Sequence, residues 1–152
     1  MLATILFVQE EALTGIPNIQ LTIFLILLYS KKLGWYKTSI IVCIHVLLDN
    51  LVMGSFNLLY TPAMFIGWMF IPTFITLFCK KVENPFLLGL VGALSGFVYS
   101  WIFIIPRVFI YKINVLAYLI SDIPFEITLA LCGCITTWIL YKPCSKLFDL
   151  YI

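Results

Sequence analysis

The sequence predicts an all-α integral membrane protein, a compact bundle of six transmembrane helices in one domain covering residues 1–152. Of 152 residues, 63% are hydrophobic and 11% are charged, whereas soluble domains contain about 25% charged residues. The apolar residues form long runs, which favour helices over the alternating pattern of a membrane barrel. Because one span needs about 20 residues, six spans leave no room for a soluble domain. This composition argues against a water-soluble enzyme and a disordered chain.

The first two predicted spans are short. The first covers Met1–Leu13 and ends at Thr14-Gly15-Ile16-Pro17, because Gly and Pro interrupt helices. The second covers Ile19–Ser30 and ends before Lys31-Lys32-Leu33-Gly34. Both are shorter than an ordinary lipid-facing span. The first lacks a basic leader and contains Glu10-Glu11, so it does not fit a signal peptide. We expect either a genuinely short helix or a natural chain that begins some residues earlier.

Four longer apolar runs follow, each bounded by Gly, Pro or charged residues. They cover Thr38–Phe56, Pro62–Cys79, Phe86–Ile105 and Leu116–Tyr141. Lys80-Lys81 separates the second run from the third, and Pro106-Arg107 closes the third. The sequence shows no internal repeat and no low-complexity tract.

The positive charges predict the orientation, because Lys and Arg concentrate in cytoplasmic loops. Seven of the nine follow even-numbered spans: Lys31, Lys32, Lys37, Lys80, Lys81, Lys142 and Lys146. This distribution predicts that both termini are cytoplasmic. Arg107 and Lys112 lie in the predicted outer loop instead. They either attract an anionic group to the outer face or extend toward lipid headgroups.

Polar residues inside the apolar spans predict a binding cavity, since an ionisable group at membrane depth costs about 2.5–3.5 kcal/mol. The span residues are Gln9, Glu10, Glu11, His45, Asp49, Asp122 and Glu126. Residues of the outer turns join them, namely Asn18, Gln20, Asn57 and Tyr60, and the nearby aromatics are Trp68 and Trp101. Most lie toward the outer ends of their spans. We therefore expect a polar, aromatic-lined cavity open to the outside.

Each of these residues also has a structural interpretation. Asp122 is suited to cap a helix that restarts at Pro124. Glu126 lies on the same helical face as Asp122 and makes either a ligand contact or a structural one. His45 and Asp49 are four residues apart and form either an interhelical pair or a proton relay. The two tryptophans are equally suited to helix packing or to the membrane interface.

Small residues in the fifth predicted span indicate close helix packing. Gly89 is four residues from Ala93, and Gly92 is four residues from Gly96. This spacing lets another helix approach closely.

No catalytic or metal-binding motif stands out. The five cysteines lack zinc spacing, and one histidine cannot build a multi-histidine site. There is no phosphate-binding glycine loop or dinucleotide fingerprint. Ala93-Leu94-Ser95-Gly96 is faintly similar to the serine motif of rhomboid proteases, but no histidine follows it. We expect a protein that is not an enzyme and has no metal or cofactor.

Three passages carry a family resemblance. They are Ile16-Pro17-Asn18-Ile19-Gln20-Leu21-Thr22, the stretch from Leu47-Leu48-Asp49-Asn50 to Tyr60-Thr61-Pro62 followed by Trp68, and Ser121-Asp122-Ile123-Pro124-Phe125-Glu126, closed by Tyr141-Lys142-Pro143. In these passages, and in its six compact spans, the chain resembles the substrate-binding S component of energy-coupling factor (ECF) vitamin transporters.

The resemblance implies a six-helix bundle in a prokaryotic plasma membrane that captures a vitamin-like micronutrient from outside. It implies no ATPase in this chain and no nucleic-acid partner. The protein would dock on a membrane coupling subunit that carries two cytoplasmic ATPases, and would then topple to release its cargo inward. Related S components bind riboflavin, thiamine, folate, biotin, pantothenate and others, and the sequence does not name the solute.

The resemblance also implies site residues, because the first outer loop and the outer ends of the later helices line the family's site. The matching positions are Asn18, Gln20, Trp68, Trp101, Arg107, Asp122 and Glu126, to which the polar cluster adds Asn57 and Tyr60. Arg107 beside the two acids indicates a ligand with both charge signs or several hydrogen-bonding groups. Ala3 is the available coupling-subunit contact, and its usual partner alanine would precede Met1, which fits a natural chain with a longer start.

Three rival functions come from other classes. A membrane scaffold or assembly subunit would use the acids and glycines for helix packing alone. A self-contained secondary transporter would need coupling-ion residues and usually two related halves. An intramembrane enzyme would need motifs that the sequence lacks, and only loss of an activity in Ser95→Ala would revive it.

Overall fold

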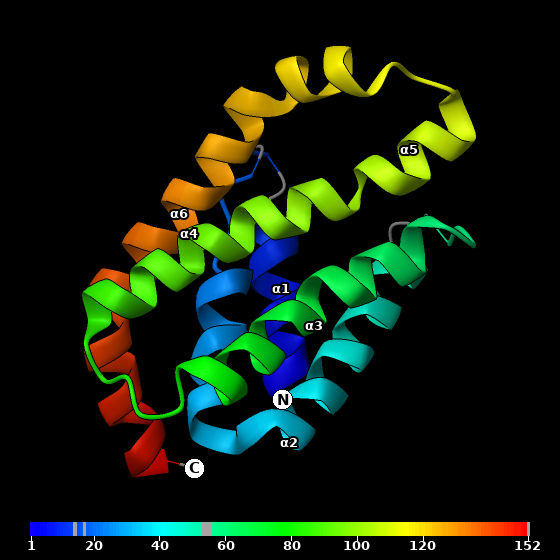
Figure 1. Ribbon diagram of the computed structural model, residues 1–152. Coiled ribbons are helices and arrows are strands. Elements are labelled where there is room, and N and C mark those ends of the chain that lie inside the picture. Colours follow the sequence, from blue (N-terminus) through cyan, green and yellow to red (C-terminus); the bar gives the residue numbers. More distant parts are fainter. Residues whose placement is uncertain (14, 17, 53–55, 152) are drawn as a thin grey trace.

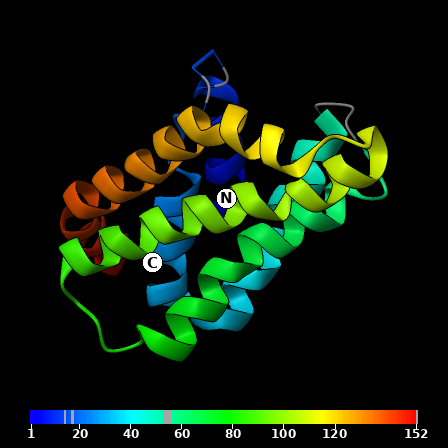
Figure 2. The same cartoon turned by 45° about the horizontal axis from the view of Figure 1, so that its top comes forward.

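The computed structural model describes residues 1–13, 15–16, 18–52 and 56–151, and within these ranges the protein contains helices and turns but no strand. The helices are α1 (Leu2–Leu13), α2 (Thr22–Val52), α3 (Tyr60–Phe78), α4 (Pro85–Ile102), α5 (Ile104–Tyr111) and α6 (Val115–Tyr151). Figures 1 and 2 show them packed as one bundle. The all-helical prediction is confirmed.

Within the described ranges, four helical stretches are long and apolar enough to cross a membrane. They are Thr22–Val52, Tyr60–Phe78, Pro85–Tyr111 and Val115–Leu150. This finding agrees with a multi-pass membrane protein but differs from the six separate spans expected from sequence. The expected second and third spans are joined in α2, and α1 has only 12 residues.

The join in α2 is a sharp bend at Gly34. Gly34 has φ 79° and ψ 177° inside an otherwise helical stretch, a backbone conformation that is essentially restricted to glycine. The bend falls within the break that the sequence predicts at residues 31–34. The helix therefore changes direction without a connecting loop, which is why two expected spans appear as one element.

Two predicted boundaries were wrong. Pro106-Arg107 does not close the fifth apolar run; the break comes at Phe103, between α4 and α5. Pro106 lies in the first turn of α5, where a missing backbone N–H breaks no helical hydrogen bond.

The last helix runs beyond Tyr141 to Tyr151, with Pro124 and Pro143 inside it. Its final turns pack on α2, because the Phe148 ring lies 6.0 Å from that of Tyr29 and Asp149 pairs with Lys32 at 2.6 Å. Tertiary contacts therefore extend α6 past the predicted end.

The closest helix pair is α4 with α6, which run side by side in Figures 1 and 2. A Cβ on Gly92 would lie 2.6 Å from the carbonyl oxygen of Gly133, and one on Gly96 would lie 2.9 Å from Ala130 Cα. The glycines therefore let the two backbones meet, as the small-residue spacing predicts. The apolar core on the other side of α4 includes Leu27 and Trp68.

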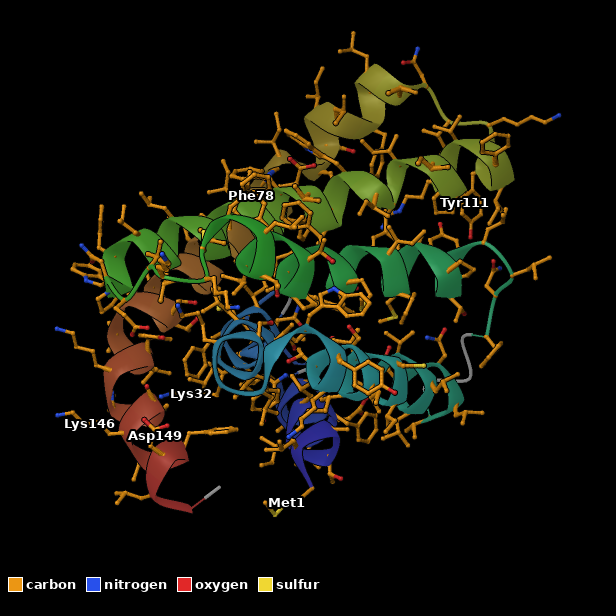
Figure 3. The ribbon with its side chains drawn as sticks, turned by 60° about the horizontal axis from the view of Figure 1, so that its bottom comes forward. Met1, Lys32, Phe78, Tyr111, Lys146 and Asp149 are labelled. Carbon is orange, nitrogen blue, oxygen red and sulfur yellow. The ribbon has the colours of Figure 1, made fainter. Side chains whose placement is uncertain are left out.

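The two ends of the bundle differ. Both termini, the bend of α2 and the α3–α4 connection lie toward the lower end in Figure 1, while α5 and the start of α6 lie at the upper end. Figure 3 shows Lys32 and Asp149 far from Tyr111. The candidate site lies at the upper end.

Candidate functional site

The first cavity lies between α4, α5 and the start of α6. It has a volume of about 440 Å³, and its polar lining comes from Asn18, Ser100, Arg107, Tyr118 and Asp122. These five residues come from four segments that are separate in sequence, namely the α1–α2 connection, α4, α5 and α6, so the cavity exists only in the folded chain. Asn18 also ties the segment after α1 to α6, because its amide donates to the carbonyl of Phe125 at 3.1 Å.

Arg107, Tyr118 and Asp122 form a connected group in the first cavity. The guanidinium carbon of Arg107 lies 4.7 Å from the centre of the Tyr118 ring, a cation–π distance. The Tyr118 hydroxyl donates to Asp122 Oδ2 at 2.7 Å. Since α6 is helical on both sides of Asp122, the capping interpretation of Asp122 was wrong. Its carboxylate accepts from a side chain one turn earlier instead.

Glu126 is buried where α6 meets α4. The side chain is 4% exposed, and its Oε2 accepts a hydrogen bond from Trp101 Nε1 at 3.3 Å. Its other oxygen, Oε1, is buried without a hydrogen-bond partner among the described residues. Trp101 is itself 51% exposed, so its ring covers the outside of this contact. Neither residue lines the first cavity directly.

The second cavity adjoins the first. It has a volume of about 340 Å³ and lies between the end of α2, the start of α3 and α5. Its lining includes Asp49, Asn57, Tyr60 and Tyr111, and Phe103 is shared with the first cavity. Because the Phe103 ring lines both, the two cavities are neighbours that meet at this side chain.

Asn57 has a structural role as well as a place in the second cavity. Its Oδ1 accepts from the backbone N–H of Leu59 at 2.9 Å and from that of Tyr60 at 3.2 Å. Both donors lie at the start of α3, where backbone N–H groups lack helical partners. Asn57 therefore fixes the point at which Tyr60 enters the cavity wall.

Aromatic rings form a row from the core to the cavities. Trp68 and Tyr99 are stacked with centroids 3.9 Å apart, and Tyr99 meets Phe103 edge-on at 5.0 Å. Phe103 in turn stacks on Tyr60 at 5.9 Å. Trp68 is fully buried and its Nε1 has no hydrogen-bond partner in the described part of the chain.

A third polar group lies between α1 and α2. His45 Nε2 is 3.1 Å from Glu10 Oε2, and Gln9 donates to the Thr22 hydroxyl at 2.6 Å. Gln20 belongs here rather than to either cavity, because its Oε1 accepts from the same hydroxyl at 3.3 Å. The interhelical partner of His45 is therefore Glu10, and not the neighbouring Asp49.

Ala3 is buried, at 8% exposure, whereas Ile5 and Val8 on the same helix are 43% and 55% exposed. The accessible face of α1 is thus formed by other residues than the one expected to contact a coupling subunit.

Several cavity residues escaped the sequence analysis, notably Tyr99, Ser100, Phe103 and Tyr118. A signal for two of them was present, because Tyr99 and Phe103 lie eight and four residues before Arg107 and so share its side of a helical run. Within the described part of the chain, no group of three or more His, Cys, Asp and Glu side chains is placed to hold a metal ion.

The fold and these cavities define a class: an all-helical protein of membrane-spanning character with two adjoining polar and aromatic cavities at one end. The chain matches no family model, no curated protein and no solved structure.

Proposed function

We propose that this protein is the substrate-specific binding subunit, or S component, of an ECF-type importer that captures a vitamin-like solute from outside the cell. The observation that carries the proposal is the pair of cavities joined at Phe103. Each falls within the range of about 300–1,000 Å³ that small-molecule sites occupy. Their aromatic walls and few polar groups match the usual composition of such sites.

The chemistry of the walls supports solute binding over helix packing alone. Arg107 stacks on one face of Tyr118 and also interacts with Tyr60. A guanidinium has five N–H donors, which is more than these two contacts use. Buried polar groups in a scaffold would normally be satisfied by each other. Here Asp49 lines the second cavity at 6% exposure, and its carboxylate accepts no hydrogen bond within the described ranges.

We infer that the protein crosses the prokaryotic plasma membrane with both termini in the cytoplasm. Six membrane segments result if α1 counts as one, if α2 contributes two that meet at Gly34, and if α4 and α5 together contribute one. The seven lysines that predict the orientation then lie on the cytoplasmic side, and the cavities open outward. ATP-driven release would depend on a coupling subunit and two ATPases.

The test is to purify the protein in mild detergent from rich medium and identify extracted small molecules by mass spectrometry. We expect one vitamin-like solute at a stoichiometric amount. Arg107→Gln should reduce its retention, whereas Asp149→Asn, far from the cavities, should not. A protein that remains empty across media supplemented with vitamins overturns the proposal and favours a scaffold.

A secondary transporter is the second candidate, because Glu10 and His45 form an acid–imidazole pair inside an apolar bundle. Such groups at membrane depth occur in proton relays. Proton-dependent uptake of the identified solute by the protein alone in liposomes would favour this candidate. Uptake that requires the coupling subunit and ATP would favour the S component.

A further inference from the structure

Asp49 is the least compensated charge at the candidate site. It is 6% exposed and lines the second cavity. Among the described residues, no hydrogen-bond donor contacts its carboxylate and no cationic nitrogen lies within ion-pair distance of it. A buried carboxylate without a partner is costly in an apolar environment. The arrangement therefore leaves room for a partner that is not part of this chain.

The basic side chains near Asp49 contact other residues. His45, one turn before Asp49, has its Nε2 3.1 Å from Glu10. Arg107 lines the first cavity with its guanidinium over Tyr118, and its side chain also interacts with Tyr60 in the wall of the second cavity. The second cavity thus has an acidic group and no basic side chain in its lining.

Besides Asp49, the second cavity is lined by two amides and by a mostly aromatic wall. The amide oxygens of Asn50 and Asn57 already accept hydrogen bonds from this chain. Tyr60 and Phe103 are stacked with centroids 5.9 Å apart, and Tyr111 and Met64 complete the apolar lining. Aromatic faces attract organic cations as well as flat rings. Asp49 is the one carboxylate in this lining, whereas a metal ion prefers several oxygen ligands.

On the basis of the proposed function, we propose that the solute carries a positively charged nitrogen close to an aromatic ring, as in an arylmethylamine, and that Asp49 binds this nitrogen in the second cavity. The ring then packs against Tyr60 and Phe103. Any further polar part of the solute extends past Phe103 into the first cavity, toward Arg107.

Three probes of matched size test the charge preference: benzylamine, a cation at neutral pH, benzyl alcohol, which is neutral, and benzoate, an anion. Their binding to the protein in lipid nanodiscs is measured by saturation-transfer nuclear magnetic resonance at millimolar concentration. We expect benzylamine to bind about tenfold to a hundredfold more tightly than benzyl alcohol, as a charge-assisted hydrogen bond allows. Benzoate should bind most weakly.

The substitution Asp49→Asn keeps the size of the side chain and removes its charge. It should abolish the preference for benzylamine, whereas Asp149→Asn should preserve it. Equal binding of benzylamine and benzyl alcohol by the unsubstituted protein, no binding of benzylamine, or a preference that survives Asp49→Asn overturns the inference. The first two outcomes need no variant, so they apply even if Asp49→Asn fails to fold.

The experiments distinguish failure of the cation inference from failure of the proposed binding function. A neutral or anionic solute that co-purifies at a stoichiometric amount overturns the cation inference and leaves the binding role intact. A protein without any co-purified solute overturns the binding role.

Discussion

His45 Nε2 lies 3.1 Å from Glu10 Oε2, and this contact joins α2 to α1 inside the bundle. The imidazole is fully buried and the carboxylate side chain is 19% exposed. The short α1 packs chiefly against α2, so this pair is a main polar attachment of α1 to the rest of the protein.

We predict that Glu10 and His45 are energetically coupled. Glu10→Gln and His45→Ala should each lower the thermal unfolding temperature in detergent. The double variant should be less destabilised than the sum, with a coupling of about 1–3 kcal/mol, because the two side chains are in direct contact inside the bundle. Additive effects would mean that the contact contributes nothing to stability.

Gly34 should be intolerant of any side chain. Gly34→Ala is expected to destabilise the protein by about 1–3 kcal/mol, since its backbone conformation is essentially restricted to glycine. Nothing lies within 4 Å of a Cβ added there, so the penalty is one of backbone conformation. Gly15→Ala, also in open space but without positive φ, is the matched control for thermal unfolding. Equal melting of both variants would contradict the sharp bend in α2.

A side chain at Gly92 should be unfavourable because of steric overlap rather than backbone conformation. We expect Gly92→Ala to destabilise the protein by about 1–3 kcal/mol, because its Cβ would lie 2.6 Å from the carbonyl oxygen of Gly133. The two helices would have to separate. Thermal unfolding compared with Gly15→Ala measures the effect, and an unchanged melting temperature would show that α4 and α6 are farther apart than described.

Lys31 should stabilise the end of α3. Its Nζ donates to the carbonyls of Lys80 and Val82, both at 2.8 Å, and its side chain is 4% exposed. Lys31→Met keeps the apolar stem, removes these donors and should cost about 1–3 kcal/mol. The exposed side chain of Lys80 makes Lys80→Met a suitable control in the same unfolding assay. Comparable losses in both variants would point to a general charge effect.

The proposed orientation predicts opposite accessibility for two exposed lysines. With the exposed Cys43 replaced by Ala, Lys112→Cys should react with a membrane-impermeant maleimide on intact cells. Lys142→Cys should react only after the cells are opened, because it lies among the positive charges of the cytoplasmic side. The reverse pattern would invert the topology and place the cavities inside.

The predicted and observed helices differ at glycine and proline residues, because the effect of these residues on a helix depends on the surrounding structure. Lys31-Lys32-Leu33-Gly34 correctly marks a break, but local pattern could not distinguish a loop from a bend within one helix. Pro106 was interpreted as a stop, although a proline is equally compatible with the first turn of a new helix. The extension of α6 past Pro143 depends on contacts with Tyr29 and Lys32, which are distant in sequence.

The candidate site was predicted in part. Asn18, Asn57, Tyr60, Arg107 and Asp122 line the two cavities. Trp68, Trp101 and Glu126 lie nearby without lining them, and Gln20 joins the α1–α2 polar group instead. The sequence indicated that polar groups gather at one end of the bundle, but not which of them satisfy each other.

By itself, the sequence determined that this protein is all-helical and apolar enough to span a membrane, because composition and the lengths of apolar runs suffice for that inference. It also predicted that the glycines of α4 admit another helix at close range, since the spacing of small residues is a local property, but it did not identify α6 as that helix. Only the tertiary structure decided that Glu10 pairs with His45, that Phe103 lines two cavities, and that Asp49 has no hydrogen-bond or ion-pair partner among the described residues. Those relationships depend on how helices rotate and cross, which packing fixes and local sequence does not.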